Sequence, residues 1–254
     1  MIKHIRECRT KTKKDLYEGI MSASVYENIE SDLFKIRLGD LFEIIERLDL
    51  SQEEFFYYVF KDILESPLKK LRKINNFFNT SDFVNLIEEY KSEDKYYYTI
   101  QTIYYMSKND LGQARKYAIK VWNLLKEYDE LFAYDLFCLS HIFPMFNEEV
   151  FNQINKKLIR NFKKWRDFDD FYKVEIAYYL NAGRYFQELK DNEKALTFYQ
   201  KAYDTATLYN LGDYTGVALY RLGMLKDNDD MIKQAEFLLE IFDTKKLSTL
   251  QNDN

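Results

Sequence analysis

Most cations near the start of the chain fall in a short stretch where acidic residues are rare. Six Lys and Arg side chains lie before position 15, with Glu7 as the one acid among them: Lys3, Arg6, Arg9, Lys11, Lys13 and Lys14. Such a density of positive side chains is typical of a surface that neutralises nucleic-acid phosphates. Lys13 and Lys14 also fall at an expected helix start, where the backbone amides themselves favour a phosphate. The stretch therefore predicts a local phosphate-binding patch.

Small and polar residues that could contact base edges follow this patch. Asn28 can pair bidentately with adenine, and Glu27 can accept from cytosine N4 although nearby phosphate would repel it. Lys35 and Arg37 come next and form a candidate second phosphate contact. Hydroxyl or methyl groups suited to base edges are supplied by Ser22, Ala23 and Ser24.

Residues suited to catalysis or metal binding do not form a recognisable cluster. The two imidazoles, His4 and His141, lack a second ligand at metal-binding spacing. The chain has no Gly-rich phosphate loop, no G-x-S-x-G and no C-x-x-C. The acidic run at Asp167, Asp169 and Asp170 lies beside several cations and is typical of a solvated turn. The sequence predicts a protein that is not an enzyme and that uses no metal or cofactor.

Five short helices with tight turns are expected to position the candidate DNA-contacting residues. The first covers 2–8, and Thr12 offers a hydroxyl cap to a second over 13–20. A third follows Ser22 and Ser24, and a fifth begins at the capping box Ser51-Gln52-Glu53-Glu54. The fourth has an apolar face at the helical period, formed by Leu38, Leu41, Ile44, Ile45 and Leu48.

These residues resemble a known family of regulators. The carrying motifs are I-R-x-x-R at 5–9, D-L at 15–16, M-S-x-S with I-E at 21–30, and L-x-x-L-x-x-I-I-x-x-L-x-L-S-x-x-E-F at 38–55. This order resembles a Cro/repressor-type helix-turn-helix and, more narrowly, the amino-terminal domain of the Rgg/GadR/MutR regulators of Gram-positive bacteria. The resemblance implies that the third helix enters the major groove of DNA. Glu27 and Asn28 stand where the family usually has a hydroxyl and an arginine, and Asp32 stands where it has glycine.

Composition favours long helices and confines any DNA contact to the patch. Gly 7, Pro 2 and 17% aromatic residues favour an all-α chain, and the net charge of -5 argues against a protein that coats nucleic acid. Cys8 and Cys138 are expected to be free thiols in a reducing compartment. No apolar run approaches the roughly 20 residues that span a bilayer, and the start lacks a signal-peptide pattern. We expect a cytoplasmic protein without membrane contact.

Beyond residue 62 the sequence shows a weak repeat of helix pairs. The segment from Tyr179 to Ala202 matches the tetratricopeptide frame, in which small residues let two antiparallel helices approach closely. The frame returns at Leu219 to Leu239, and about five pairs are expected up to Phe242. We therefore expect a helix-turn-helix domain over 1–62, an α-solenoid over 63–254 and a frayed tail from Ser248. The small residues of the best repeat are Gly183, Ala195 and Ala202.

The concave face of such a solenoid is a usual place to bind an extended peptide. Asn181 can pair with both groups of a peptide bond, and Arg184 can hold a carboxylate bidentately. Gln187 or Glu188 is expected beside them. Tyr at helical spacing is more often core than ligand surface, so that alternative stays open for each Tyr. The residues predicted to face the groove are Tyr178, Asn181, Arg184, Tyr220, Arg221 and Met224.

The resemblance now covers both halves of the chain, because regulators of this family join such a domain to tetratricopeptide-like repeats. It implies a homodimeric transcription factor that binds promoter DNA and senses a short signalling peptide, such as a quorum-sensing pheromone. The implied dimer contacts lie within Met231 to Phe242, at Phe237, Leu238 and Ile241. Two alternatives remain: an interaction scaffold whose head does not read DNA, and a repeat domain that only dimerises.

Overall fold

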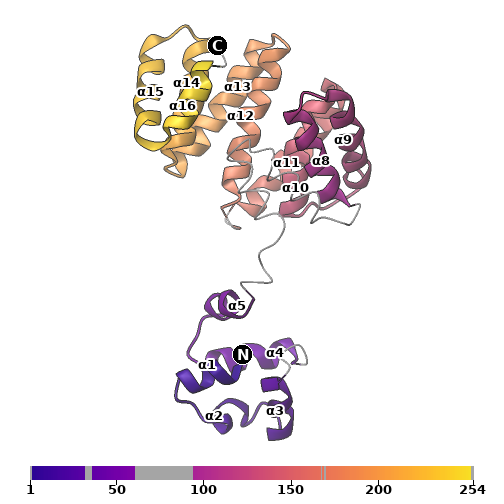
Figure 1. Cartoon of the computed structure of the whole chain (residues 1–254), viewed down its shortest axis with the longest axis vertical. Helices are drawn as coiled ribbons and strands as arrows, with labels where there is room; N and C mark the ends of the chain where they lie inside the picture. Colours follow the sequence, from indigo (N-terminus) through magenta and orange to yellow (C-terminus); the bar gives the residue numbers. More distant parts are fainter. Residues whose placement is uncertain (1, 32–35, 61–93, 167, 169, 253–254) are drawn as a thin grey trace. The chain divides into compact units, whose positions relative to one another are not determined.

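A computed structural model describes residues 2–31, 36–60, 94–166, 168 and 170–252. The chain divides into two compact units, residues 1–76 and 77–254, called here the head unit and the repeat unit. Every regular element in the described ranges is a helix, so the all-α expectation is confirmed (Figure 1). No helix in these ranges is long and apolar enough to cross a membrane. The domain boundary expected at 62/63 lies outside the described residues.

The head unit contains the five short helices expected from the sequence. Helix α2 ends three residues earlier than expected, since Gly19 adopts a left-handed backbone with φ of 82° just after it. The helices are α1 (Ile2–Cys8), α2 (Lys13–Tyr17), α3 (Ala23–Ser31), α4 (Leu38–Arg47) and α5 (Gln52–Phe60).

Side-chain caps fix where the head helices begin. The Thr12 hydroxyl accepts from the Asp15 amide at 3.2 Å, and the Asp15 carboxylate accepts from the Thr12 amide at 2.7 Å. Ser51 and Glu54 form the same reciprocal box at the start of α5, at 3.1 and 2.8 Å. The Ser22 hydroxyl accepts from the Val25 amide at the start of α3. The three caps expected from the sequence are confirmed, and each satisfies amides that a helix start leaves unpaired.

One apolar cluster holds the head helices together. Leu38 was expected to belong to it but is 61% exposed, because it begins α4 and the cluster is filled from Leu41 onward. Tyr26 and Ile29 of α3 are buried in the cluster, which fixes which side of α3 faces outward. Its other buried members are Ile2, Ile5, Leu16, Leu41, Ile44, Ile45, Leu48, Phe55 and Val59.

Antiparallel helix pairs build the repeat unit (Figure 1). Four of the roughly five pairs expected from the sequence lie in the described residues. The helices are α8 (Lys95–Ser107), α9 (Leu111–Leu125), α10 (Ala133–Ile142), α11 (Glu148–Trp165), α12 (Tyr172–Glu188), α13 (Asn192–Leu208), α14 (Gly212–Leu225) and α15 (Asp229–Phe242), followed by α16 (Thr244–Asn252).

Two segments of the repeat unit differ from expectation. The first lies between α10 and α11, where the small-residue frame is absent. Pro144 there lies in a 3-10 turn (η2, Phe143–Met145) that connects the two helices, where a missing amide is tolerated. The tail expected to fray from Ser248 is helical to Asn252, because Leu250 is 5% exposed and packs with Leu247 against α14 and α15.

Close helix packing in the repeat unit depends on glycine, as the sequence indicated. A Cβ placed on Gly183 of α12 would lie 2.5 Å from the ring of Tyr199 of α13. A Cβ on Gly223 of α14 would lie 2.8 Å from Ile232 of α15. Ala195 and Ala202 are fully buried at the same seam between α12 and α13. The expected role of these small residues is confirmed.

Candidate functional site

Helix α3 presents one continuous exposed face. Tyr26 and Ile29 anchor the helix, with 0% and 3% of their side chains exposed. At helical spacing, residues 23, 24, 27, 28 and 31 lie on the side of α3 opposite to these two buried residues. The exposed face consists of Ala23, Ser24, Glu27, Asn28 and Ser31. Ala23, Ser24 and Asn28 were predicted to contact bases, and the structure brings them together; Ser22 lies at the cap instead.

Several predicted phosphate contacts are already paired with carboxylates of the same unit. Lys13 Nζ lies 2.9 Å from Glu27 Oε1, which joins α2 to the exposed face of α3. The bond to Lys13 lowers the pKa of Glu27, so this acid is ionised at neutral pH. Lys11 pairs with Asp49 at 2.8 Å, and Lys14 pairs with Glu18 one turn along at 3.3 Å. The partners of Lys11 and Lys13 come from distant parts of the chain, so the residues next to these two cations did not indicate them.

Arg6 is a structural residue rather than an exposed phosphate contact, which corrects the expectation. Its side chain is 10% exposed, and Nε donates to Glu30 Oε1 at 2.7 Å. Nη1 donates to the carbonyl of Lys11 at 3.2 Å, so the guanidinium ties α1 to α3 and to the turn before α2. The bond to Glu30 raises the pKa of Arg6. From the sequence alone, an arginine at this position could equally be a buried structural residue or an exposed phosphate contact.

Two of the three remaining predicted cations lie in the described residues, and both are exposed. They are Arg9 and Arg37, the residue before α4. Lys35 lies outside the described residues. Over the first 60 residues, nine Lys and Arg stand against twelve Asp and Glu. The positive patch is therefore local, and the surrounding helices of the first 60 residues are acidic on balance.

Arg47 fixes the angle between α2 and α4, and the sequence reasoning missed it. Its Nη1 donates to the carbonyl of Glu18 at 2.7 Å and to that of Leu16 at 3.3 Å. These carbonyls belong to the last turn of α2, where a cation also favours the helix dipole. The sequence does show a basic residue at the end of an amphipathic helix. It does not show the partners of Arg47, because the carbonyls of α2 lie about thirty residues earlier in the chain.

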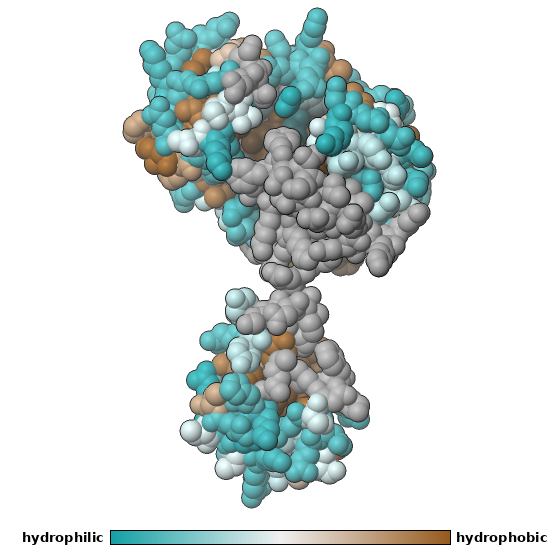
Figure 2. Space-filling model, viewed as in Figure 1, coloured by the Kyte–Doolittle hydropathy of each residue, from teal (hydrophilic) through white to brown (hydrophobic). Residues whose placement is uncertain are grey.

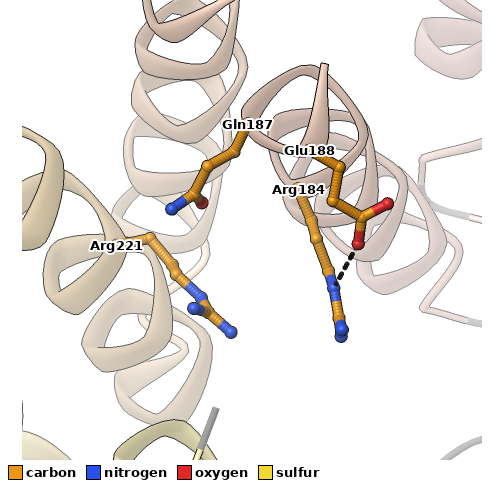
Figure 3. A pocket seen from close by; sticks show the side chains of 4 residues that line it. All are labelled: Arg184, Gln187, Glu188 and Arg221. Carbon is orange, nitrogen blue, oxygen red and sulfur yellow. Dashed lines mark hydrogen bonds and ion pairs between the residues drawn. The ribbon is translucent and has the colours of Figure 1, made fainter. Parts of the chain in front are cut away.

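Two neighbouring helices of the repeat unit line a small pocket. The pocket holds about 190 Å³ and is lined by Arg184, Gln187 and Glu188 of α12 and by Arg221 of α14. We call it the α12–α14 pocket. Figure 3 shows both arginine side chains extending from their helices toward the same space. Arg184 Nε lies 3.1 Å from Glu188 Oε1 in an exposed ion pair.

The predicted groove residues separate into exposed and buried ones. Asn181 and Arg184 are exposed, and Arg221 and Met224 are half-buried. Tyr178 is fully buried and donates to Asn155 Oδ1 at 2.7 Å, so its expected place on the groove surface is wrong. Tyr220 is 4% exposed and belongs to the cluster between α14 and α15. An aromatic ring buries more apolar area in the seam than it would in an open groove.

Helix α15 exposes large apolar side chains. Phe237 is 63% exposed and Ile241, one turn along, is 59% exposed. Figure 2 shows apolar atoms gathered at the edge of the repeat unit where α15 lies. Leu238 is half-buried and packs into the cluster between α14 and α15 instead. Two of the three predicted dimer contacts thus share an open face.

The two thiols lie in different surroundings. Cys8 is exposed, and Cys138 is fully buried in α10, where burial raises its thiol pKa to about 12. Across the described ranges no three His, Cys, Asp or Glu side chains gather as a metal site would require.

Comparisons with known proteins place this fold. A scan of protein-family models and a search of curated proteins found no match. Among solved structures, the chain is similar over 99% of its length to a candidate transcriptional regulator from Listeria monocytogenes EGD-e (93% of that chain, TM-score 0.76, 17% identity). It is similar over 99% to the SHP pheromone receptor Rgg2 of Streptococcus dysgalactiae (96% of that chain, TM-score 0.72, 14% identity). The PlcR structure from Bacillus thuringiensis, solved with the peptide PapR7 and DNA, matches over 98% (96% of that chain, TM-score 0.65, 18% identity).

The chain has the fold of these regulators. The helical head and the helical repeats each have a counterpart in proteins that share fewer than one residue in five with it.

Proposed function

We propose that the chain is a DNA-binding transcriptional regulator of the Rgg and PlcR kind, whose repeat unit senses a short peptide. The exposed face of α3 is the observation that carries the proposal. It offers Ser24 and Asn28 to base edges, while Tyr26 and Ile29 hold the helix in the head. Matches over nearly the whole chain to a regulator solved with peptide and DNA, and to a pheromone receptor, support it.

The proposed DNA contact requires Lys13 to exchange partners. On a duplex, Lys13 would leave Glu27 for a backbone phosphate, and Glu27 would then face the base edges of the major groove. A carboxylate there can accept from cytosine N4, and it repels other acceptors and phosphate. In this arrangement Glu27 lowers the overall affinity for DNA but raises the preference for cytosine at the base that it faces.

The proposed regulator is a homodimer formed through the α15 face. Phe237 and Ile241 supply exposed apolar area one turn apart. Two-fold symmetry in the protein predicts a DNA site with two inverted half-sites, separated by about one helical turn or a multiple of it.

Selection of duplexes from a random-sequence pool by the full-length chain tests the DNA-binding part. We expect enrichment of an inverted repeat, with binding to the selected site falling as salt rises. Lys13→Ala should lower the slope of log affinity against log salt by about one contact, and Asn28→Ala should weaken discrimination at one base pair by ~1–3 kcal/mol. Glu27→Gln should strengthen binding to unselected DNA. Lys116→Ala, an exposed change in the repeat unit, should alter none of these.

A second candidate function is an interaction scaffold whose head does not read DNA. The carboxylate partners of Lys11, Lys13 and Lys14 favour it, as does the acidic balance of the first 60 residues. A pool that shows no enrichment even at low salt, with wild type and with Glu27→Gln, would favour the scaffold over the regulator.

A further inference from the structure

Exposed aromatic side chains gather where successive helix pairs of the repeat unit are joined. Phe132, just before α10, is 58% exposed, and Phe168, between α11 and α12, is 44% exposed. The half-buried ring of Trp165, at the end of α11, lies 5.7 Å between centroids from each of them. Tyr134 follows, 6.2 Å from Phe168. We call these four rings the aromatic row. Single exposed apolar side chains are common, but contiguous ones mark surfaces that bind another molecule.

The aromatic row is held in place by hydrogen bonds behind it. Trp165 Nε1 donates to the carbonyl of Leu131 at 3.1 Å, which fixes the indole against the residue before Phe132. The amide of Phe168 donates to the carbonyl of Trp165 at 3.0 Å. Between these two residues, Arg166 is bonded to the buried Glu175. A partner would therefore meet rings that are already ordered, which lowers the entropy cost of binding.

The surroundings of the aromatic row are acidic. The residues between the helices, 126–132 and 166–171, include six acids and two bases. Glu127 and Asp129 are exposed, and neither has an ion-pair partner in the part of the chain that the structure describes. Such a surface repels phosphate, so it does not suit the stacked bases of a nucleic acid. It favours a partner with positive side chains.

Cations of the chain itself already occupy parts of this surface. Lys164 Nζ lies 5.6 Å from the centroid of the Trp165 ring and pairs with Glu130. An aromatic face and a carboxylate thus hold one cation together, a combination that is stronger than either contact alone. A second group of the same kind consists of Lys95, Tyr96 and Asp135. The surface therefore binds cations by a recurring arrangement.

We propose that the aromatic row, with Glu127 and Asp129, is a docking surface for a basic and apolar segment of another protein. No cation of the described residues lies over Phe132 or Phe168, so arginine or lysine side chains of the partner would take these two rings and pair with the two carboxylates. None of these residues lines the α12–α14 pocket. The inference goes beyond the proposed function, because the partner is neither DNA nor the signalling peptide.

Three peptides of equal length, acetylated and amidated, test the charge and the apolar character of the partner. The first repeats Arg-Leu-Pro, the second Arg-Ser-Gly and the third Glu-Leu-Pro. Each is titrated into the full-length chain. The emission of Trp165 reports binding at the aromatic row, since Trp122 is only 8% exposed. We expect the first peptide to bind about tenfold more tightly than either of the others. Equal binding of the three, or no binding of the first, would overturn the proposal.

Removing the two exposed rings assigns the apolar part of the preference. Phe132→Ala with Phe168→Ala should weaken binding of the Arg-Leu-Pro peptide about tenfold. Leu208→Ala, an exposed apolar change on α13, should leave it unchanged. Sedimentation equilibrium should give the ring variant the same mass as the wild type. A lower mass would assign the rings to a contact between copies of this chain and would overturn docking of another protein.

Neutralising the two acids assigns the charge part. Glu127→Gln with Asp129→Asn should remove most of the preference for arginine over glutamate in the peptide. Glu149→Gln with Glu193→Gln, two exposed acids at the starts of α11 and α13, should leave that preference intact. Lys164→Gln should strengthen binding of the Arg-Leu-Pro peptide several-fold, because it removes the resident cation, and misfolding cannot produce such a gain. A preference that survives loss of both acids, or weaker binding by Lys164→Gln, would refute the proposal.

Discussion

His141 makes the stability of the repeat unit depend on pH. Its Nδ1 lies 2.8 Å from the carbonyl oxygen of Phe137, and the two rings are 4.2 Å apart between centroids. Burial lowers the pKa of His141 to about 4 from 6.5, so the unfolded chain takes up the proton first as pH falls. The stabilising effect is complete above pH 6.5 and is lost as pH falls toward 4.

We predict a loss of about 1 kcal/mol in unfolding free energy between pH 7.5 and pH 5.5. Urea unfolding followed by tryptophan fluorescence measures it, since Trp122 and Trp165 both lie in the repeat unit. His141→Leu should flatten the dependence in this window, whereas His4→Leu, an exposed change in the head, should leave it as in the wild type. A wild-type curve that is already flat would contradict the half-buried neutral imidazole.

An ion pair between the partly exposed Arg166 and the buried Glu175 joins the end of α11 to α12. Arg166 donates from Nε and Nη2 to both oxygens of Glu175 at 2.7 Å, and the Tyr179 hydroxyl donates to the same carboxylate at 2.9 Å. Glu175 is 1% exposed. Arg166→Ala would leave that carboxylate buried without its cation, and we predict a loss of about 3–5 kcal/mol. Arg160→Ala should cost under about 0.5 kcal/mol. The urea unfolding midpoints of the two variants measure the difference. Similar midpoints would contradict the prediction and would mean that water satisfies Glu175 when the arginine is removed.

Residue types alone left several side chains ambiguous at this scale. Arg6 and Tyr178 were expected at surfaces but are buried, because their partners Glu30 and Asn155 come from distant helices. Asn181 and Arg184 were placed on the exposed side of α12, since flanking small and aromatic residues define its buried side. A charged or amphipathic residue is ambiguous until the elements around it are known.

At the scale of elements, the seam between α12 and α13 depends on one missing methyl group. Gly183→Ala would place its Cβ 2.5 Å from the Tyr199 ring, and overpacking of this kind costs about 1–3 kcal/mol. Gly112→Ala is the matched control, because its Cβ would meet only Asp110 Oδ1, at 3.6 Å. We expect the control to be neutral or stabilising by up to about 1 kcal/mol, since alanine is the better helix former. Thermal unfolding of both variants tests this prediction. Equal melting temperatures would contradict the close packing of α12 against α13 at Gly183.

Helix starts were predictable because their caps are local. The boxes at Thr12 and Ser51 involve residues three positions apart, so sequence spacing specifies them. The turns between repeat helices have a local signal that the repeat frame alone did not use. Lys190 has a left-handed backbone with φ of 62°, and the next residue, Asp191, caps α13; the same combination occurs at Asn109 with Asp110 and at Asp227 with Asn228.

For the whole molecule, the open face of α15 predicts the assembly state. Phe237→Asp with Ile241→Asp should convert a dimer to a monomer, because two charges would be buried in an apolar contact. Leu208→Asp is the control, since Leu208 is 68% exposed on α13. Sedimentation equilibrium measures the mass of each. A wild-type chain that is monomeric at high concentration would remove this face from the proposal.

For the whole molecule, the arrangement of helices was more predictable from the sequence than the charge of its surfaces. The order of helices follows from patterns repeated along the chain, so that a head and a stack of pairs could be expected from the sequence. The balance of charge at a surface depends on which helices meet. The partners of Lys11 and Lys13 lie on α3 and just after α4, and the sequence near the cations does not contain them.

That internal pairing has a kinetic consequence for a protein that reads DNA as proposed. A strongly cationic head is attracted to any duplex and spends much of its search sliding along it. The head unit has fourteen acids and fourteen bases, so its net charge gives little long-range attraction to phosphate, and its encounters with DNA should occur at ordinary rather than electrostatically steered rates. Such a protein would find its site mainly from free solution. Occupancy of that site would then follow the number of copies in the cell more closely than the amount of surrounding DNA.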